Sequence, residues 1–210
     1  MSSGSYRLGV LASGGGTNFQ AVLARIQSGE LPAEVVVVIS NNSGSGALRR
    51  ARGNQIDAIH LSGLTHPDPV SLDRAIEGAL HERRVDLVLL AGYMKKLGPR
   101  TLERYRDRIL NIHPALLPAF GGQGMYGRRV HEAVVASGAT ESGVTVHLVD
   151  EHYDNGPIVA QETVPVEDGD SPETLGARVL ELEHTLFPAV VGLFATNRVR
   201  IHENQVTIVD

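Results

Sequence analysis

The segment Val35–Ser40 (VVVVIS) most constrains the fold, because β-branched side chains occupy both faces of this run. A strand of this kind has to be buried on both sides, as in the centre of a parallel sheet covered by helices. Further apolar runs at Leu8–Ala12, Asp57–Leu61, Asp86–Ala91 and Arg108–Ile112 recur along the chain, with stretches of helical spacing between them. This alternation predicts βαβ units that build a parallel sheet.

The pattern changes toward the C-terminus, where Val144–Val149 and Pro157–Val164 alternate more in polarity, as antiparallel strands do. We therefore predict an α/β fold: an open, mostly parallel, Rossmann-like sheet with helices on both faces and an antiparallel C-terminal extension. Pro188 should kink or end the last helix. The predicted helices are Phe19–Gln27, Ala47–Arg52, Ser71–Arg84, Pro99–Tyr105 and Ser171–Asn197.

Length and composition bound the class of protein. We expect one domain over the 210 residues, with residues 1–6 disordered. The balance of 24 acidic and 19 basic residues leaves no basic excess for a nucleic-acid backbone. The sequence has no cysteine, which excludes disulfides and fits a reducing compartment. Because no apolar run could span a bilayer and no signal peptide precedes the domain, we expect a cytoplasmic protein that binds neither nucleic acid nor membranes.

A glycine-rich turn, Ser13–Asn18 (SGGGTN), links the first predicted strand to the first predicted helix. Free N–H groups and the positive end of the helix attract phosphate at such a turn. The spacing matches neither a dinucleotide fingerprint nor a Walker loop, and Asn41 and Asn42 follow the next strand in place of an acid. A monophosphate therefore fits better than NAD or ATP. The alternative is a turn that needs glycine only for close packing.

Asn111 and His113 end a predicted buried strand and point to the same face, because residues two apart on a strand do. Ligands bind at this carboxyl edge of parallel sheets, and two such hydrogen-bond donors suit a developing oxyanion. The alternative is a polar pair satisfied within the fold. The loop Pro114–Arg128, with two prolines and four glycines, follows directly and favours a functional site.

A carboxylate that assists His113 has to come from elsewhere in the chain. The polar turn after Val149 offers Asp150, Glu151 and Asp154, and spacing alone does not choose among them. The nine histidines lack metal-ligand spacing, so we predict no metal. We expect packing or supporting roles for His147 and His184, and solvated positions for His131 and His152.

Several segments together resemble the family of folate-dependent phosphoribosylglycinamide formyltransferases, in its bacterial single-domain form. The resemblance extends from about Arg7 to His202. The N-x-H-P-x-L-L-P segment with a downstream D-x-G-P is typical of proteins that use 10-formyltetrahydrofolate, and the S-G-x-G-[ST]-N turn is typical of the ribonucleotide branch. The matching segments, in order, are Ser13–Asn18, Leu90–Met94, Asn111–Pro118, Gly143–His147, Asp154–Ile158, Gly169–Ser171 and Glu183–His184.

The resemblance implies transfer of the formyl group of 10-formyltetrahydrofolate, as co-substrate, to the amine of glycinamide ribonucleotide in purine biosynthesis. Asn111, His113 and Asp154 match the catalytic trio, which selects Asp154 among the three acids. Asn111 and protonated His113 would donate to the oxyanion, and Asp154 would favour the imidazolium. The resemblance also implies a cis peptide at Leu117–Pro118, small-molecule substrates, and a monomer or homodimer.

The resemblance also assigns the binding residues for the two substrates. The residues that match the ribonucleotide site are Gly16, Thr17, Asn18 and Glu183. The residues that match the folate site are Met94, Lys95, Lys96, Leu97, Asn111, Val149, Asp150 and Asp154.

The sequence departs from the family where Pro69 replaces an arginine associated with the folate tail, and Lys95 or Lys96 would supply the missing charge. A related hydrolase of 10-formyltetrahydrofolate is the main alternative activity. A folate- or nucleotide-binding module without catalysis is the alternative from another class. Methionyl-tRNA formyltransferase is a weaker alternative, because it requires an added RNA-binding domain and a more basic surface.

Overall fold

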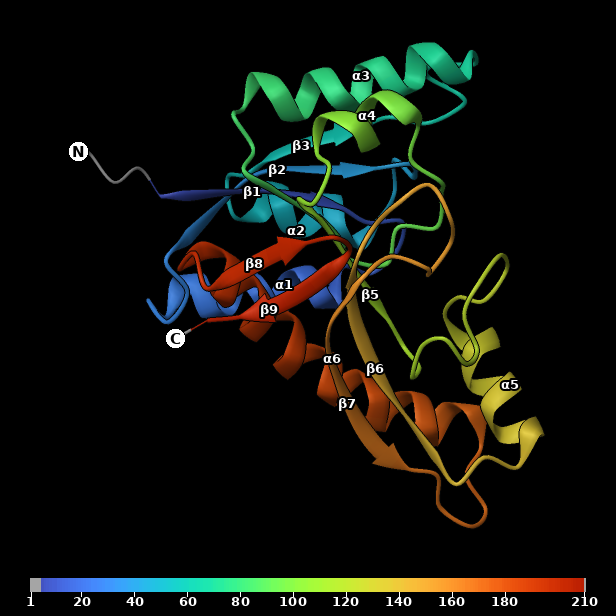
Figure 1. Ribbon diagram of the computed structural model, residues 1–210. Helices are drawn as coiled ribbons and strands as arrows, with labels where there is room; N and C mark the ends of the chain where they lie inside the picture. Colours follow the sequence, from blue (N-terminus) through green and yellow to red (C-terminus); the bar gives the residue numbers. More distant parts are fainter. Residues whose placement is uncertain (1–4, 210) are drawn as a thin grey trace.

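The computed structural model describes residues 5–209 (Figure 1). Seven strands form one sheet in the order β3-β2-β1-β4-β5-β6-β7. The five strands from β3 to β5 are parallel, and β6 and β7 extend the sheet in antiparallel fashion. The predicted fold class is confirmed. The strands are β1 (Tyr6–Leu11), β2 (Ala33–Ser40), β3 (Asp57–His60), β4 (Leu87–Leu90), β5 (Ile109–His113), β6 (Glu141–Leu148) and β7 (Ile158–Pro165).

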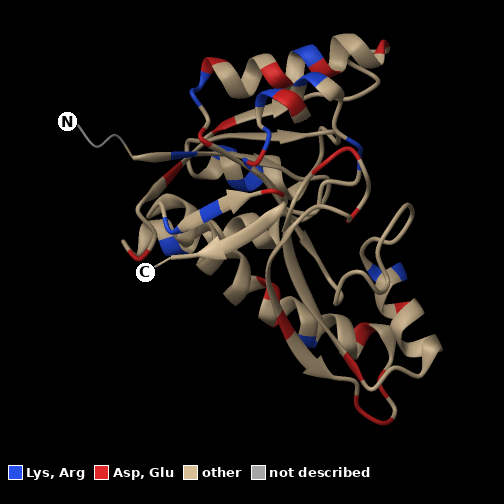
Figure 2. Ribbon diagram, in the orientation of Figure 1, with Lys and Arg blue, Asp and Glu red and all other residues tan. Residues whose placement is uncertain are grey.

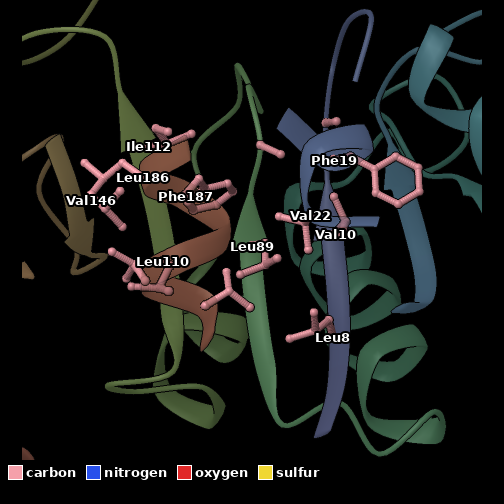
Figure 3. Close-up of a cluster of buried hydrophobic side chains, with 14 of the residues drawn as sticks. Leu8, Val10, Phe19, Val22, Leu89, Leu110, Ile112, Val146, Leu186 and Phe187 are labelled. Carbon is pink, nitrogen blue, oxygen red and sulfur yellow. The ribbon is translucent and has the colours of Figure 1, made fainter. Parts of the chain in front are cut away.

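Helices cover both faces of the sheet, as expected for parallel strands buried on both sides (Figure 1). One face packs on α1, α2 and α6, with Phe19 and Phe187 fully buried there together with strand residues such as Leu110 (Figure 3). The other face packs on α3 and α4. The helices are α1 (Thr17–Gln27), α2 (Gly46–Gly53), α3 (Pro69–Glu82), α4 (Pro99–Arg104), α5 (Arg128–Ser137) and α6 (Pro172–Ala195).

Charges of both signs are interspersed on α3 and α4 (Figure 2). Glu77 on α3 pairs with Arg104 at 3.0 Å and lies 3.9 Å from Arg100, so ion pairs tie the two helices together. Pro69 occupies the first turn of α3, where its missing N–H costs nothing, and the Asp68 side chain caps the helix by accepting from Ser71 N.

Two details of the predicted fold need correction. Of the residues expected to be disordered, 1–4 lie outside the described part of the chain, but Tyr6 already begins β1. Of the two outcomes expected at Pro188, a kink or an end of the last helix, the structure excludes the end, because the helix continues to Ala195. Burial of Pro188 and of its neighbours Phe187 and Val191 holds the helix together across the missing hydrogen bond.

Three elements were absent from the sequence prediction, one helix and two strands. Helix α5 fills part of the interval after the long loop, and β8 (Val199–His202) and β9 (Gln205–Ile208) form a separate antiparallel hairpin. The hairpin turns through Glu203 and Asn204, both with positive φ (48° and 64°). This geometry is usually signalled by glycine, which the hairpin turn lacks. None of the described helices is long and apolar enough to cross a membrane.

Candidate active site

A cavity of about 500 Å³ lies beyond the carboxyl ends of β4 and β5, where ligands bind in open parallel sheets. Its walls come from the ends of β4 and β5, the segment 92–97, the glycine-rich segment 122–127 and the loop 149–154. Asn111 and His113 both face this cavity from β5. The same-face expectation for this pair is therefore confirmed.

Asp154 is the acid that lies beside this pair. Its Oδ2 atom accepts from Gly122 N at 2.9 Å and lies 3.7 Å from His113 Nδ1, while Oδ1 lies 3.5 Å from Asn111 Nδ2. The other two acids of the turn have different surroundings: Asp150 accepts from His152 N at 2.7 Å, and Glu151 is exposed. Asp154 reaches this position in a left-handed conformation (φ 53°), which Asp and Asn adopt more readily than other side chains.

His147 joins the cluster because it lies directly opposite Asn111 in the antiparallel pairing of β5 with β6. Its Nδ1 donates to the Leu148 carbonyl at 2.8 Å, so in the neutral ring Nε2 is an acceptor for Asn111 Nδ2, 3.0 Å away. This bond fixes which way the Asn111 amide points. The predicted supporting role of His147 is thus to orient Asn111, although the sequence did not connect the two residues.

Burial and neighbouring groups set the charges in the cluster. Burial lowers the pKa of His113 by more than Asp154 and the Phe120 carbonyl raise it, so the net shift is downward. Burial alone would raise the pKa of Asp154, but His147, His113 and the Gly122 N–H outweigh it and leave the pKa below its usual value. At neutral pH the favoured pair is an ionised Asp154 and a neutral His113.

The sequence analysis expects a protonated His113 at the stage of the oxyanion, whereas burial favours the neutral ring in the unliganded site. Nε2 of the ring lies 2.9 Å from the Phe120 carbonyl and Nδ1 faces the Asp154 carboxylate. A neutral ring can donate to only one of these two acceptors. A proton that arrives during a reaction therefore has a prepared place on this ring.

The glycine-rich turn follows β1 at the same edge of the sheet. Gly16 has φ 73°, and a Cβ there would lie 2.8 Å from Ala47 Cα, so this glycine is required by packing. A Cβ on Gly14 or Gly15 would meet no atom within 4 Å, so packing does not explain those two glycines. Met94 N donates to Ser13 Oγ at 2.8 Å and ties the turn to the cavity wall. Gly16 and Thr17 lie outside the cavity lining.

Asn18 and Glu183 are 165 residues apart in sequence and form a buried hydrogen bond of 2.8 Å at the cavity wall. Burial raises the pKa of Glu183 to about 7, despite the stabilising bond from Asn18. The Asn18 Oδ1 atom is buried and has no partner within residues 5–209. The structure therefore brings two of the predicted ribonucleotide residues together and leaves one buried acceptor atom, Asn18 Oδ1, for a ligand to bind.

The predicted folate residues also gather at this cavity. All of them line it: Met94, Lys95, Lys96, Leu97, Asn111, Val149, Asp150 and Asp154. Lys95 and Lys96 are the only lysines of the sequence, and they also line a neighbouring cavity of about 730 Å³ that contains Pro69. Two cations therefore stand between the two cavities.

Sequence reasoning missed Tyr93 and the segment 122–127 as parts of the cavity wall, although the length of the loop Pro114–Arg128 had suggested function.

Two of the histidine predictions can be judged by burial. His152 is exposed as expected, but His131 is buried between α5 and α6, with its ring near Gly176. No group of three potential metal ligands occurs within the described residues, and the predicted absence of a metal stays a prediction.

The Leu117–Pro118 peptide in the long loop is cis, the isomer that the family resemblance implies and that the sequence alone does not determine. The loop is anchored to the sheet by Thr145, whose Oγ1 accepts from Leu117 N at 3.0 Å and donates to the Ala115 carbonyl. These bonds fix the start of the loop that runs past His113 to Gly122.

Comparison with known proteins places this geometry in a family. The model of the formyl transferase family matches residues 6–191. A chloroplastic phosphoribosylglycinamide formyltransferase from Vigna unguiculata is 44% identical over 92% of the chain, which spans 62% of that relative's length. The crystal structure of a glycinamide ribonucleotide transformylase from Symbiobacterium toebii superimposes with a TM-score of 0.92 and 41% identity, covering 98% of this chain and 95% of that one.

A formyltetrahydrofolate deformylase from Pseudomonas syringae is a more distant match, with a TM-score of 0.87 and 26% identity over 99% of this chain and 67% of that one. The family match extends from β1 into α6 and includes every residue of the Asn111, His113 and Asp154 cluster. The chain belongs to the formyl transferase family.

Proposed function

We propose that this chain transfers the formyl group of 10-formyltetrahydrofolate to the primary amine of glycinamide ribonucleotide, as an enzyme of purine biosynthesis. The observation that carries the proposal is the convergence of Asn111, His113 and Asp154 on one cavity. The glycine-rich turn is tied to the wall of this cavity by the bond from Met94 N to Ser13, and the predicted folate residues line the cavity. The relatives named above support the choice of both substrates. We also propose a single cytoplasmic domain that acts on small molecules, needs no metal and is a monomer or homodimer.

The proposed chemistry is an addition followed by an elimination. The amine nitrogen bonds to the formyl carbon, and the carbonyl electrons move to oxygen. Asn111 and His113 stabilise that oxyanion by hydrogen bonds, an effect that typically contributes about 10²–10³ in rate per donor. Asp154 accepts the proton lost from the amine, directly or through water, and passes it to His113, which holds it as the imidazolium. The carbon–nitrogen bond to the folate then breaks, and N10 takes the proton.

The proposed ground state of His113 follows from its lowered pKa. Because the unliganded ring is mainly neutral, the imidazolium forms as the oxyanion develops, and one of its two N–H groups has to leave its present neighbour, Asp154 or the Phe120 carbonyl, to reach the oxyanion. Asn111 holds one amide N–H against His147, which keeps its nitrogen end in the cavity. The Asn111 donor is therefore oriented before substrate arrives.

The test of this function is the deformylation of 10-formyl-5,8-dideazafolate, followed by absorbance with and without glycinamide ribonucleotide. Turnover that depends on the amine supports the transferase. Turnover without the amine supports a hydrolase, for which the likeness to the Pseudomonas syringae deformylase is the specific observation. Binding of both ligands without any turnover would contradict both activities and favour a binding module.

We expect Gly16→Val to raise the KM for glycinamide ribonucleotide at least about tenfold and to leave the KM for folate unchanged. The substitution forces a left-handed residue with a side chain against Ala47, at a strain of about 1–2 kcal/mol, and so displaces the turn. Steady-state kinetics with each substrate varied in turn measures this. Gly14→Ala is the matched control, because a Cβ there meets no atom within 4 Å. A rise in the folate KM instead would mean that the two subsites are exchanged.

Lys95 and Lys96 are proposed to hold the negative tail of the folate, in place of the arginine that Pro69 replaces. We expect the preference for a triglutamate over a monoglutamate folate to shrink several-fold in Lys95→Ala or Lys96→Ala, because each removes one of two cations beside both cavities. KM against tail length is the measurement. Arg106→Ala, at the opposite edge of the sheet, is the control for loss of charge. A preference that survives in the double variant would exclude this role.

A further inference from the structure

The glycine-rich turn is held from behind by α2, whose contacts with the turn are close. A Cβ on Gly46 would lie 2.6 Å from the Gly15 carbonyl oxygen, and one on Gly16 would lie 2.8 Å from Ala47 Cα. The first turn of α2 therefore packs directly against the backbone of Gly15 and Gly16. Any ligand of this turn has to approach from the other side.

Each carbonyl of the three glycines has a hydrogen-bond partner, on α2 for Gly14 and Gly15 and on α1 for Gly16. Gly14 O accepts from Ala47 N at 3.1 Å, and Gly16 O accepts from Gln20 N at 2.9 Å. The middle carbonyl is different, because its partner is a side chain. Gly15 O accepts from Arg50 Nε at 3.0 Å.

The direction of each carbonyl fixes the direction of an N–H. In a trans peptide the C=O and the N–H point in opposite directions, and the peptide between Gly15 and Gly16 is trans. Arg50 at the oxygen end of that peptide therefore aims the Gly16 N–H away from α2. A cation on the carbonyl also polarises the peptide, which makes its N–H a stronger donor. Within residues 5–209, the N–H groups of Gly14, Gly15 and Gly16 have no hydrogen-bond acceptor.

Arg50 is itself held in this position. Its Nη1 atom donates to Gln20 Oε1 at 3.1 Å, and Gln20 lies on α1, the helix that starts at the turn. The guanidinium thus bridges α1, α2 and the turn with two bonds in one plane. A lysine has no planar fork and could not make both bonds in this geometry.

We infer that Arg50 is a positioning residue for the phosphate of the ribonucleotide: it orients the Gly15–Gly16 peptide so that the Gly16 N–H faces the anion. The inference rests on the proposed function, since it assumes that the turn receives this phosphate. Arg50 acts through the backbone and adds positive charge behind the turn. It touches neither the formyl donor nor the reacting amine.

The test compares the binding of glycinamide ribonucleotide with that of its dephosphorylated nucleoside, by calorimetry, in the full-length protein. The Kd of the nucleoside divided by the Kd of the nucleotide measures how much the phosphate alone contributes to binding. We expect Arg50→Met to reduce this ratio about tenfold, the size of one lost charge-assisted hydrogen bond. The nucleoside Kd, the folate KM and kcat should stay unchanged. Arg50→Lys should reduce the ratio less, because it keeps the charge and loses the two-bond geometry.

Arg52→Met is the matched control. Arg52 lies on the same helix and carries the same charge, but its exposed side chain makes no hydrogen bond or ion pair with the described residues. It should keep the wild-type ratio. If Arg50→Met folds poorly, Gln20→Leu tests the same bridge, since it removes the second anchor of Arg50 and should also lower the ratio.

Three results would overturn the inference. An unchanged ratio in Arg50→Met excludes the role, and equal weakening of nucleotide and nucleoside means that Arg50 only stabilises the fold. A wild-type ratio in Arg50→Lys means that charge alone matters. Failure of the proposed function looks different, because the wild-type protein would then show no amine-dependent formyl transfer or no preference for the phosphorylated ligand.

Discussion

Asp154→Asn is expected to lower kcat about 10²–10⁴-fold, the range that positioned acid–base catalysis contributes. Asn matches the shape of Asp and also tolerates the left-handed backbone of this position (φ 53°), so the loop should keep its conformation. The variant loses the charge that faces His113 Nδ1 at 3.7 Å and the base that takes the amine proton. Substrate KM values should therefore change little.

Two measurements test the prediction for Asp154→Asn. Steady-state kinetics gives kcat, and NMR titration of the His113 ring gives its pKa. Because Asp154 raises the pKa of His113, removal of the carboxylate should lower that pKa further. Glu151→Gln is the control, because Glu151 lies in the same loop but is exposed. Near-normal turnover in Asp154→Asn would remove Asp154 from the mechanism.

Glu183→Gln is expected to increase stability at alkaline pH and to weaken binding of the ribonucleotide. The folded protein raises the pKa of Glu183 from 4.5 to about 7 because the carboxyl is buried. The stability associated with the neutral acid is fully present below about pH 4.5 and is lost as pH rises through 7. Above that pH the ionised group costs up to about 3 kcal/mol of folding free energy, at 1.36 kcal/mol per pKa unit.

Gln removes this cost because it cannot ionise. Its carbonyl can accept from Asn18 Nδ2, and its N–H can reach toward Asn18 Oδ1, which has no partner within residues 5–209. Urea unfolding from pH 4.5 to 9 should show wild type and variant converging at low pH and separating above 7. Glu181→Gln, exposed on the same helix, should show no such separation. Parallel stability curves for Glu183→Gln and wild type would contradict the raised pKa.

The prediction for Glu183 also explains why a destabilising group would be retained. A carboxylate that is ionised near pH 7 inside a cavity wall is a strong acceptor for hydroxyl or amine groups of a ligand. The KM for the ribonucleotide should therefore rise in Glu183→Gln while the protein becomes harder to unfold. Opposite changes in stability and affinity are typical of groups kept for binding.

The sequence predicted most of the sheet and its helices because their signals are local. A β-branched run such as Val35–Ser40 can be satisfied only between two layers, and the structure buries it in β2. Where local signals were weak the prediction failed: α5 has a short apolar stripe, and the hairpin turn at Glu203 and Asn204 has no glycine. The helix does not end at Pro188, because tertiary burial outweighs one missing backbone bond.

For the site, the sequence by itself determined which side chains share a strand face and where the glycine turn lies. Asn111 and His113 point together because strands have a period of two residues, whatever the rest of the chain does. Residue spacing did not determine which of the three acids, Asp150, Glu151 or Asp154, lies beside His113. The structure shows that it is Asp154, because the loop after β6 turns back over the end of β5.

Contacts between distant segments were decided only by the tertiary structure. His147 meets Asn111 through the register of β5 and β6, Glu183 meets Asn18 across 165 residues, and Arg50 reaches the Gly15 carbonyl from another helix. Local sequence patterns fix the direction of a side chain relative to its own element. They do not fix which element lies opposite, since that depends on how the helices and strands pack together around the common core.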